Sequence, residues 1–202
     1  LGDVYKRQDL VAELGIAAAD AKFRDKIGGA HDRVCAGSNI TPITLGHGNT
    51  CPVPCTTTVL FDMSDVASCG ICMAKVLETE ALNAAYGFRP PTVPGTINAS
   101  ALKCQKTLAK AASGLSTGWA RALASCESAN ARGLNVPPLN CNLDPEGDIA
   151  RIRAKTASRV ATCDSFAGIP GCATTGSAAG TTACLESAIA ATVQRYTEVP
   201  YP

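Results

Sequence analysis

Two stretches with helical hydrophobic periodicity lie between four cysteines in the middle of the chain. Between Cys104 and Cys126 the apolar residues recur every three or four positions, which is typical of one face of an α-helix. The apolar positions of this first stretch are Cys104, Leu108, Ala111, Leu115, Trp119, Ala122 and Cys126. The stretch from Cys141 to Cys163 has the same spacing, at Ile149, Ile152, Thr156, Val160 and Cys163. The pattern predicts two amphipathic helices of similar length.

The residues at the ends of these stretches support two separate helices. Gly133 and the Pro137-Pro138 pair are expected to end the first helix. Asp144 is expected to be the N-cap of the second helix, with Pro145 in its first turn. Helices of matched length that are joined by a short loop lie antiparallel. We therefore expect a helical hairpin over residues 99–164.

Antiparallel packing predicts how the four cysteines pair. A bridge within either stretch would join residues about 33 Å apart on one helix, whereas a disulfide needs Cα atoms within about 7 Å. A parallel return would leave the linker between Cys126 and Cys141 little slack. We therefore expect Cys104–Cys163 and Cys126–Cys141, with Cα separations of about 5.5–6 Å.

Two glycines inside the first stretch allow two interpretations. Gly114 and Gly118 each cost about 1 kcal/mol relative to alanine in a helix. Either they let the partner helix approach closely, or they weaken an exposed turn, and the sequence does not separate these alternatives.

The flanking segments predict three more helices and an internal repeat. The helices are expected from Asp9 to Val34, from about 65 to 86, and from about 182 to 197, which makes the protein all-α. Phe23-Arg24-Asp25-Lys26 before Cys35 is similar to Ile152-Arg153-Ala154-Lys155 before Cys163. A Gly-rich loop, a cysteine and a helix follow in both places. We interpret residues 9–95 as part of one repeat unit and residues 96–202 as a complete unit.

The repeat assigns partners to the remaining cysteines. In the complete unit Cys172 is expected to pair with Cys184, whereas Cys35 is expected to be unpaired because its partner would lie upstream of the chain. For the other four cysteines, nested closure of a loop onto a helix start predicts the pairs Cys51–Cys72 and Cys55–Cys69. Four cysteines allow three connectivities, and the sequence does not choose among them.

The first eight residues look foreign to the fold. Residues 3–8 match a translation of the transposon-end adapter that is used in shotgun sequencing libraries. Residues 1–8 are therefore expected to be a non-native scar, and the chain a fragment of a longer protein.

The composition indicates the cellular compartment of the protein and limits the classes of partner that we expect. Eleven cysteines in 202 residues indicate an oxidising, extracytoplasmic compartment. No apolar run approaches the ~20 residues of a membrane span. The net charge is +1, and no basic stripe of the sequence indicates a nucleic-acid partner.

The cysteine cluster at residues 51–72 also suggests metal or redox chemistry. Cys51-x3-Cys55 and Cys69-x2-Cys72 have the spacing of a four-thiolate zinc site, and Cys69-Gly70-Ile71-Cys72 has that of a redox dithiol. The second unit has only two cysteines in the corresponding part, and no βαβ pattern accompanies the dithiol. These observations favour structural disulfides.

No other residues form a candidate site. His31 and His47 have no catalytic or ligating partners in the sequence order, so both are expected to be loop histidines. Glu78 and Glu80 are expected to be solvated charges. The sequence therefore predicts neither a cofactor nor enzyme activity.

The cysteine spacing resembles that of a known group of proteins. The residues concerned are Lys103-Cys104-Gln105-Lys106, the cysteine before Glu127, and Asp148-Ile149-Ala150 leading to Cys163. With this pattern the chain resembles uncharacterised, secreted, cysteine-rich helical repeat proteins of environmental bacteria. The resemblance implies a helical fold and a secreted or cell-surface location, and it brings no activity with it. We expect a non-catalytic structural or interaction module, with a protein or cell-surface partner. The alternative is a thiol redox or zinc-binding module built on Cys51, Cys55, Cys69 and Cys72.

Overall fold

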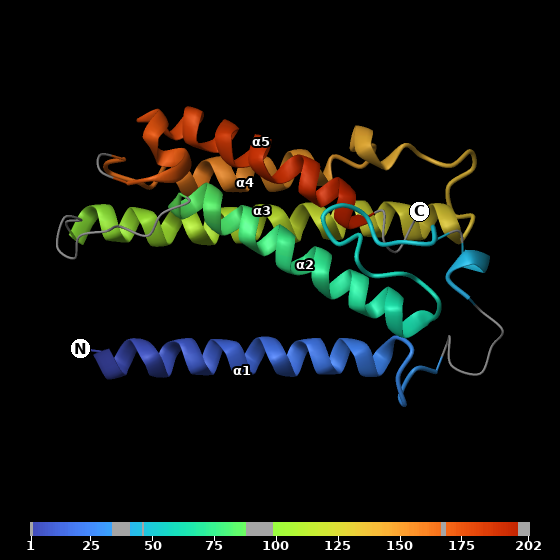
Figure 1. Ribbon diagram of the computed structural model, residues 1–202. Coiled ribbons are helices and arrows are strands. Elements are labelled where there is room, and N and C mark those ends of the chain that lie inside the picture. The colour runs from blue at the N-terminus through green and yellow to red at the C-terminus, as the bar shows by residue number, and fades with distance from the viewer. Residues whose placement is uncertain (1, 34–40, 46, 88–98, 167–168, 198–202) are drawn as a thin grey trace. The chain divides into compact units, whose positions relative to one another are not determined.

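In the computed structural model of the protein, the regular secondary structure of the described residues is helical (Figure 1). The structure describes residues 2–33, 41–45, 47–87, 99–166 and 169–197. The α-helices in these ranges are α1 (Gly2–Lys26), α2 (Met63–Tyr86), α3 (Ala99–Ala131), α4 (Asp148–Val160) and α5 (Ala178–Thr197). Within the same ranges no strand is present beyond one isolated bridge between Thr50 and Val59. The prediction of an all-α, disulfide-stapled fold is confirmed.

The chain forms two compact units that divide inside a helix. Residues 1–73 belong to the first unit and residues 74–201 to the second, so the division falls within α2. The sequence pattern instead placed a boundary between residues 95 and 96. The internal repeat itself stays a prediction.

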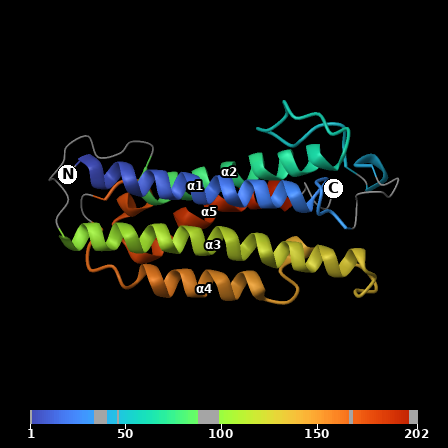
Figure 2. The same ribbon diagram turned by 90° about the horizontal axis from the view of Figure 1, so that it is seen from below.

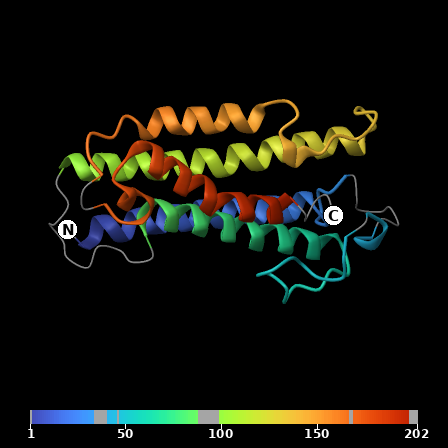
Figure 3. The ribbon, with the colours of Figure 1, turned by 90° about the horizontal axis from the view of Figure 1, so that it is seen from above.

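The second unit is built around α3. This helix packs against both α4 and α5, and α4 also contacts α5. Figures 2 and 3 show α4 running back along α3, so the two form an antiparallel hairpin. The core residues with the least exposure come from all three helices, and they include Leu108, Leu115, Leu123, Val160, Leu185, Ile189 and Val193. The C-terminal half of α2 adds Leu77, Ala81, Ala84 and Ala85 to the same buried cluster.

The two hairpin helices do not have matched lengths, contrary to the prediction. The first, α3, has 33 residues, whereas α4 has only 13. The reason is local backbone geometry: Asp144 and Gly147 have φ values of 53° and 73°, a left-handed conformation that a continuous helix does not contain. Cys141 therefore lies in a short 3-10 helix, η2 (Cys141–Leu143), before α4 begins.

Asp144 still binds the start of α4. Its two carboxylate oxygens accept hydrogen bonds from the backbone N–H groups of Ile149 and Ala150, at 2.9 and 2.7 Å. The first N–H groups of a helix have no partner inside it, so an acceptor at this position supplies one. The N-cap of α4 is Gly147, and not Asp144 as the sequence predicted, but Asp144 provides the capping carboxylate from outside the helix.

Three disulfides connect the elements of the second unit. The Cα atoms of Cys104 and Cys163 are 5.0 Å apart, and those of Cys126 and Cys141 are 5.7 Å apart. These pairs join the start of α3 to the end of α4 and the end of α3 to the segment before α4. Antiparallel helices require such pairs. The third bridge, Cys172–Cys184, joins the 3-10 helix η3 (Gly171–Thr175) to α5 with a Cα separation of 5.4 Å.

The remaining helices differ from the expected bounds at their ends. The first helix, α1, ends at Lys26 rather than near Val34, because Gly28 takes a left-handed φ of 75°. Residues 2–8 are part of α1, and their interpretation as a scar stays a prediction. The start of α2 is bound by the Asp62 carboxylate, which accepts hydrogen bonds from the backbone of Ser64 and Asp65. The predicted unpaired Cys35 lies outside the described residues.

Candidate functional site

The cysteine cluster at residues 51–72 forms two disulfides, but not the two that nested closure predicted. Cys51 is joined to Cys69 and Cys55 to Cys72, with Cα separations of 5.5 and 6.1 Å. The predicted pairs Cys51–Cys72 and Cys55–Cys69 are wrong. Cys51, Cys55 and Cys69 are buried, and Cys72 is half-buried.

The pairing follows from a small closed loop that precedes α2. Backbone hydrogen bonds from Cys51 to Thr58 and from Leu60 to Asn49, both 2.9 Å, close this loop at its base. The base lies next to the start of α2 in sequence, so the tip of the loop extends along the helix. Cys51 near the base therefore meets the earlier helix cysteine, and Cys55 nearer the tip meets the later one.

This connectivity does not provide the cysteines that a redox dithiol or a four-thiolate zinc site would need. Cys69 and Cys72 are each bonded to a different partner, so the Cys-x-x-Cys pair holds no disulfide of its own. All four sulfurs of the cluster are in disulfides, whereas a structural zinc ion is bound by thiolates. Across the described ranges, no group of three or more histidine, cysteine or acidic side chains is placed to hold a metal ion.

The two histidines have opposite surroundings. His31 Nδ1 lies 2.7 Å from Asp25 Oδ1 in an exposed pair, and this hydrogen bond raises the pKa of His31 and lowers that of Asp25. His47 is only 8% exposed, and burial lowers its pKa because the charged imidazolium loses its hydration. Both histidines lie in loops, as the sequence predicted, but only His31 is exposed, whereas His47 is buried.

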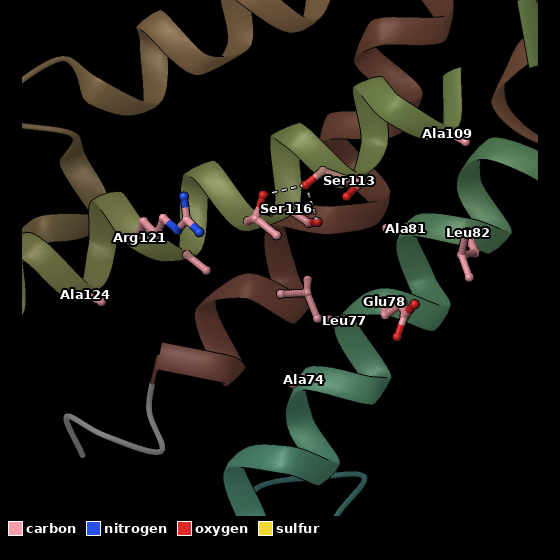
Figure 4. A pocket seen from close by; sticks show the side chains of 12 residues that line it. Ala74, Leu77, Glu78, Ala81, Leu82, Ala109, Ser113, Ser116, Arg121 and Ala124 are labelled. Carbon is pink, nitrogen blue, oxygen red and sulfur yellow. Dashed lines mark hydrogen bonds between the residues drawn. The ribbon is translucent and has the colours of Figure 1, made fainter. Parts of the chain in front are cut away.

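A hollow that the sequence analysis missed lies between α2 and α3 (Figure 4). It has a volume of about 510 Å³ and belongs entirely to the second unit. We call it the α2–α3 groove. Figure 4 shows Leu77, Glu78 and Leu82 of α2 on one side and Ser113 and Arg121 of α3 on the other. Small residues, mainly alanines, create the space between the helices.

Two of the three hydroxyls that line this groove are hydrogen-bonded to the backbone of their own helix. The hydroxyls of Ser116 and Thr117 both donate to the Ser113 carbonyl oxygen, at 3.1 and 2.7 Å (Figure 4). These bonds tie the hydroxyls to their own backbone, which leaves an apolar surface with one carboxylate, Glu78, and one guanidinium, Arg121, at its edges. The groove is suited to contact with an apolar surface, and it does not arrange a nucleophile next to a base.

The seam between α3 and α4 shows why two glycines stand inside α3. A methyl group on Gly118 would lie 3.2–3.3 Å from three carbons of Ile152 on α4. A methyl group on Gly114 would meet only the end of the Arg159 side chain, at 3.3 Å. The first of the two interpretations is confirmed for Gly118, which lets α4 approach α3 closely, whereas Gly114 is exposed and meets only a flexible side chain.

Cations gather along this seam. Arg121 of α3 and Arg151 and Lys155 of α4 line a shallow hollow of about 360 Å³ next to Gly118. Arg159 donates a hydrogen bond of 3.0 Å to the Lys110 carbonyl oxygen, so its guanidinium also lies at the seam. These cations form no continuous stripe in the sequence, because they come from two helices about 30 positions apart in the chain.

A cation on α4 also covers the tryptophan. The Arg153 guanidinium lies 4.6 Å from the centre of the Trp119 ring, which itself is only 5% exposed. Arg153 also pairs with Glu186 of α5 at 3.7 Å. This cation therefore connects the three helices and is not available to a ligand.

Comparisons of the chain with known proteins found no relative: no family model, curated protein or solved structure matches it. Within the described ranges, no helix is both long enough and apolar enough to span a membrane.

Proposed function

We propose that this chain is a non-catalytic structural or interaction module of a secreted or cell-surface repeat protein. The observation that carries the proposal is the placement of the disulfides. Cys104–Cys163 and Cys126–Cys141 close the α3–α4 hairpin towards both of its ends, and Cys172–Cys184 joins η3 to α5.

The core explains why a structural module of this kind needs such bridges. Of the α3 side chains that face the core, several are alanine, and Trp119 is the chain's one tryptophan. Small side chains bury little apolar area, so each contributes less than a leucine or phenylalanine. A disulfide stabilises a domain by typically 2–4 kcal/mol, which compensates for a thin core.

The same bridges support the proposed location. Multiple disulfides are typical of extracytoplasmic proteins, because the cytosol keeps thiols reduced. Ten cysteines of the chain are in disulfides within the described residues. This number supports a secreted or cell-surface location for the module.

The thiol redox or zinc-binding alternative uses Cys51, Cys55, Cys69 and Cys72. It requires these four cysteines to be reduced in the native protein. The buried positions of Cys51, Cys55 and Cys69 favour the structural role, since catalytic thiols are exposed to their substrates.

A thiol count under denaturing, non-reducing conditions tests the proposal. The chain has eleven cysteines and ten of them are paired, so we expect one free thiol, at Cys35. A parallel metal analysis of the purified protein is expected to give less than a stoichiometric amount of zinc. Four or more free thiols, or one bound zinc ion per chain, would overturn the structural proposal in favour of the alternative.

A further inference from the structure

Most of the cations of the α3–α4 hairpin lie on one face, although the chain as a whole is nearly neutral. Lys103, Lys106 and Lys110 have the i, i+3, i+7 spacing of one helix face, and Arg121 follows three turns later on the same side. All four are exposed, and α3 has no acidic residue from Ala99 to Cys126. Over this part α3 presents only positive charge to solvent.

The neighbouring helix extends this face across the seam. We define the basic face by the cations that α3 and α4 present along their seam: Lys103, Lys106, Lys110, Arg121, Arg151, Lys155 and Arg159. It contains one carboxylate, Asp148, which pairs with Arg151. The net charge of the whole chain is only +1. Carboxylates therefore outnumber cations over the rest of the chain, and the positive charge is segregated onto this hairpin.

Within the described part of the chain, most of these cations have no counter-ion. Among the residues that the structure describes, Arg151 is the member of the basic face that forms an ion pair. Glu78 on α2 bounds the face beyond Arg121, where both residues line the α2–α3 groove. Unpaired like charges on neighbouring turns repel one another, and an anionic partner removes this cost.

We propose that the basic face binds an acidic polysaccharide, a sugar polymer with carboxylate groups along its length. Lys103 and Arg121 are 18 positions apart, which corresponds to about 27 Å of helix, so the face matches an extended polymer rather than a single small anion. The guanidinium group of Arg121, which is exposed, presents a planar pair of donors that fits a carboxylate. The inference rests on the proposed function, because it places the partner outside the cytoplasm.

The same face is less suited to nucleic acid. Proteins that bind single strands stack bases on exposed aromatic side chains. In α3 and α4 the one aromatic residue is Trp119, which is buried beneath Arg153. Of the polyanions that a positive surface attracts, an acidic polysaccharide is therefore the one that the composition of this face favours.

Binding of polygalacturonate to the full, oxidised chain tests the inference, with dextran as the uncharged polymer and single-stranded DNA as the other polyanion. We expect polygalacturonate to bind at low ionic strength with an affinity that falls as salt rises. Dextran is expected not to bind, and DNA to bind more weakly per charge. No binding of polygalacturonate would overturn the inference, and tighter binding of DNA would overturn the class of partner.

A pair of charge-matched variants locates the site. In the first, Lys106, Lys110 and Lys155 are replaced by glutamine, which keeps side-chain length and helix propensity. Each substitution removes one exposed ion pair between a lysine and a carboxylate of the polymer. The loss of all three is expected to weaken binding roughly tenfold. The control variant replaces Lys22, Lys26 and Arg33, which are exposed cations of the first unit, by glutamine. Equal weakening by both variants would show that only net charge matters, and would overturn the assignment to the basic face.

The thiol count separates this test from that of the proposed function. If one free thiol is found but polygalacturonate does not bind, the module stands and the partner is wrong. If four or more thiols are free, the proposed function fails whatever the polymer does.

Discussion

At the scale of single residues, Gly114 and Gly118 show how one turn of helix changes what a glycine does. Both lie on the side of α3 that faces α4. The neighbour of Gly114 is the flexible end of Arg159, which can move away, whereas the neighbour of Gly118 is Ile152, which is packed between the helices. Only at Gly118 does the absence of a side chain set the distance between the two helices.

Substitutions at the two glycines are therefore expected to differ. Gly114→Ala is expected to raise the free energy of unfolding by about 1 kcal/mol, because alanine is the better helix former. Gly118→Leu is expected to lower it by about 2 kcal/mol through overpacking against Ile152. Urea unfolding of the oxidised proteins measures both values. A Gly118→Leu variant as stable as the original chain would show that α4 does not rest on this glycine.

The two histidines are expected to titrate on opposite sides of the ordinary value of 6.5. The hydrogen bond that His31 donates to the Asp25 carboxylate raises the pKa of His31, so the small contribution of His31 to stability is present below pH 6.5 and is lost as the pH rises through the raised pKa. Burial lowers the pKa of His47, so its contribution is present above pH 6.5 and is lost as the pH falls through the lowered pKa.

An NMR titration of the imidazole protons checks this expectation. Asp25→Asn is expected to lower the midpoint of His31 and to leave that of His47 unchanged. If both midpoints coincide in the original chain, neither the Asp25 pair nor the burial of His47 persists in solution.

At the scale of elements, α4 shows how two left-handed residues shorten a helix. The apolar spacing from Cys141 to Cys163 fits a continuous helix, but the backbone turns at Asp144 and Gly147. Cys141 is nevertheless placed beside Cys126, because η2 and the Asp144 carboxylate fix the entry into α4. The disulfide partners depend on the direction of the chain and not on helix length.

Asp144 is therefore expected to be important for the stability of α4. Asp144→Ala removes both hydrogen bonds to the helix start and places alanine at a φ of 53°, so we expect a loss of about 2 kcal/mol. Asp144→Asn keeps an acceptor and tolerates this conformation, and a smaller loss is expected. Denaturant unfolding measures the difference. Equal losses for the two variants would contradict a capping role for this side chain.

At the scale of the whole molecule, disulfides supplement a core made largely of small residues. In the chain-entropy account a bridge stabilises more when it closes a longer loop. The Cys104–Cys163 bridge has a sequence separation of 59, and Cys126–Cys141 has one of 15. The two bridges of one hairpin are therefore expected to make unequal contributions.

Removal of each bridge by paired alanine substitution tests this expectation. The loss of Cys104–Cys163 is expected to cost about 4 kcal/mol and that of Cys126–Cys141 about 3 kcal/mol, because the unfolded chain regains more freedom from the longer loop. Thermal and denaturant unfolding of the two double variants measure both values. A larger loss from the shorter loop would show that native packing around Cys141 outweighs chain entropy.

The sequence by itself determined the helical class, the direction of the hairpin and the partners that an antiparallel hairpin requires. These follow from local properties: the three-and-four spacing from Cys104 to Cys126, and the glycine and prolines that end the first helix. Such properties act between residues a few positions apart, and the printed chain shows them directly.

Only the tertiary structure decided the partners of Cys51 and Cys55, the start of α4 and the two surfaces along α3. Backbone hydrogen bonds close the loop before α2, and they set the direction in which that loop meets the helix. The basic face combines residues of α3 and α4, and the α2–α3 groove depends on the distance between α2 and α3. Contacts between segments far apart in the chain create these features, and no local pattern of residue types specifies such contacts.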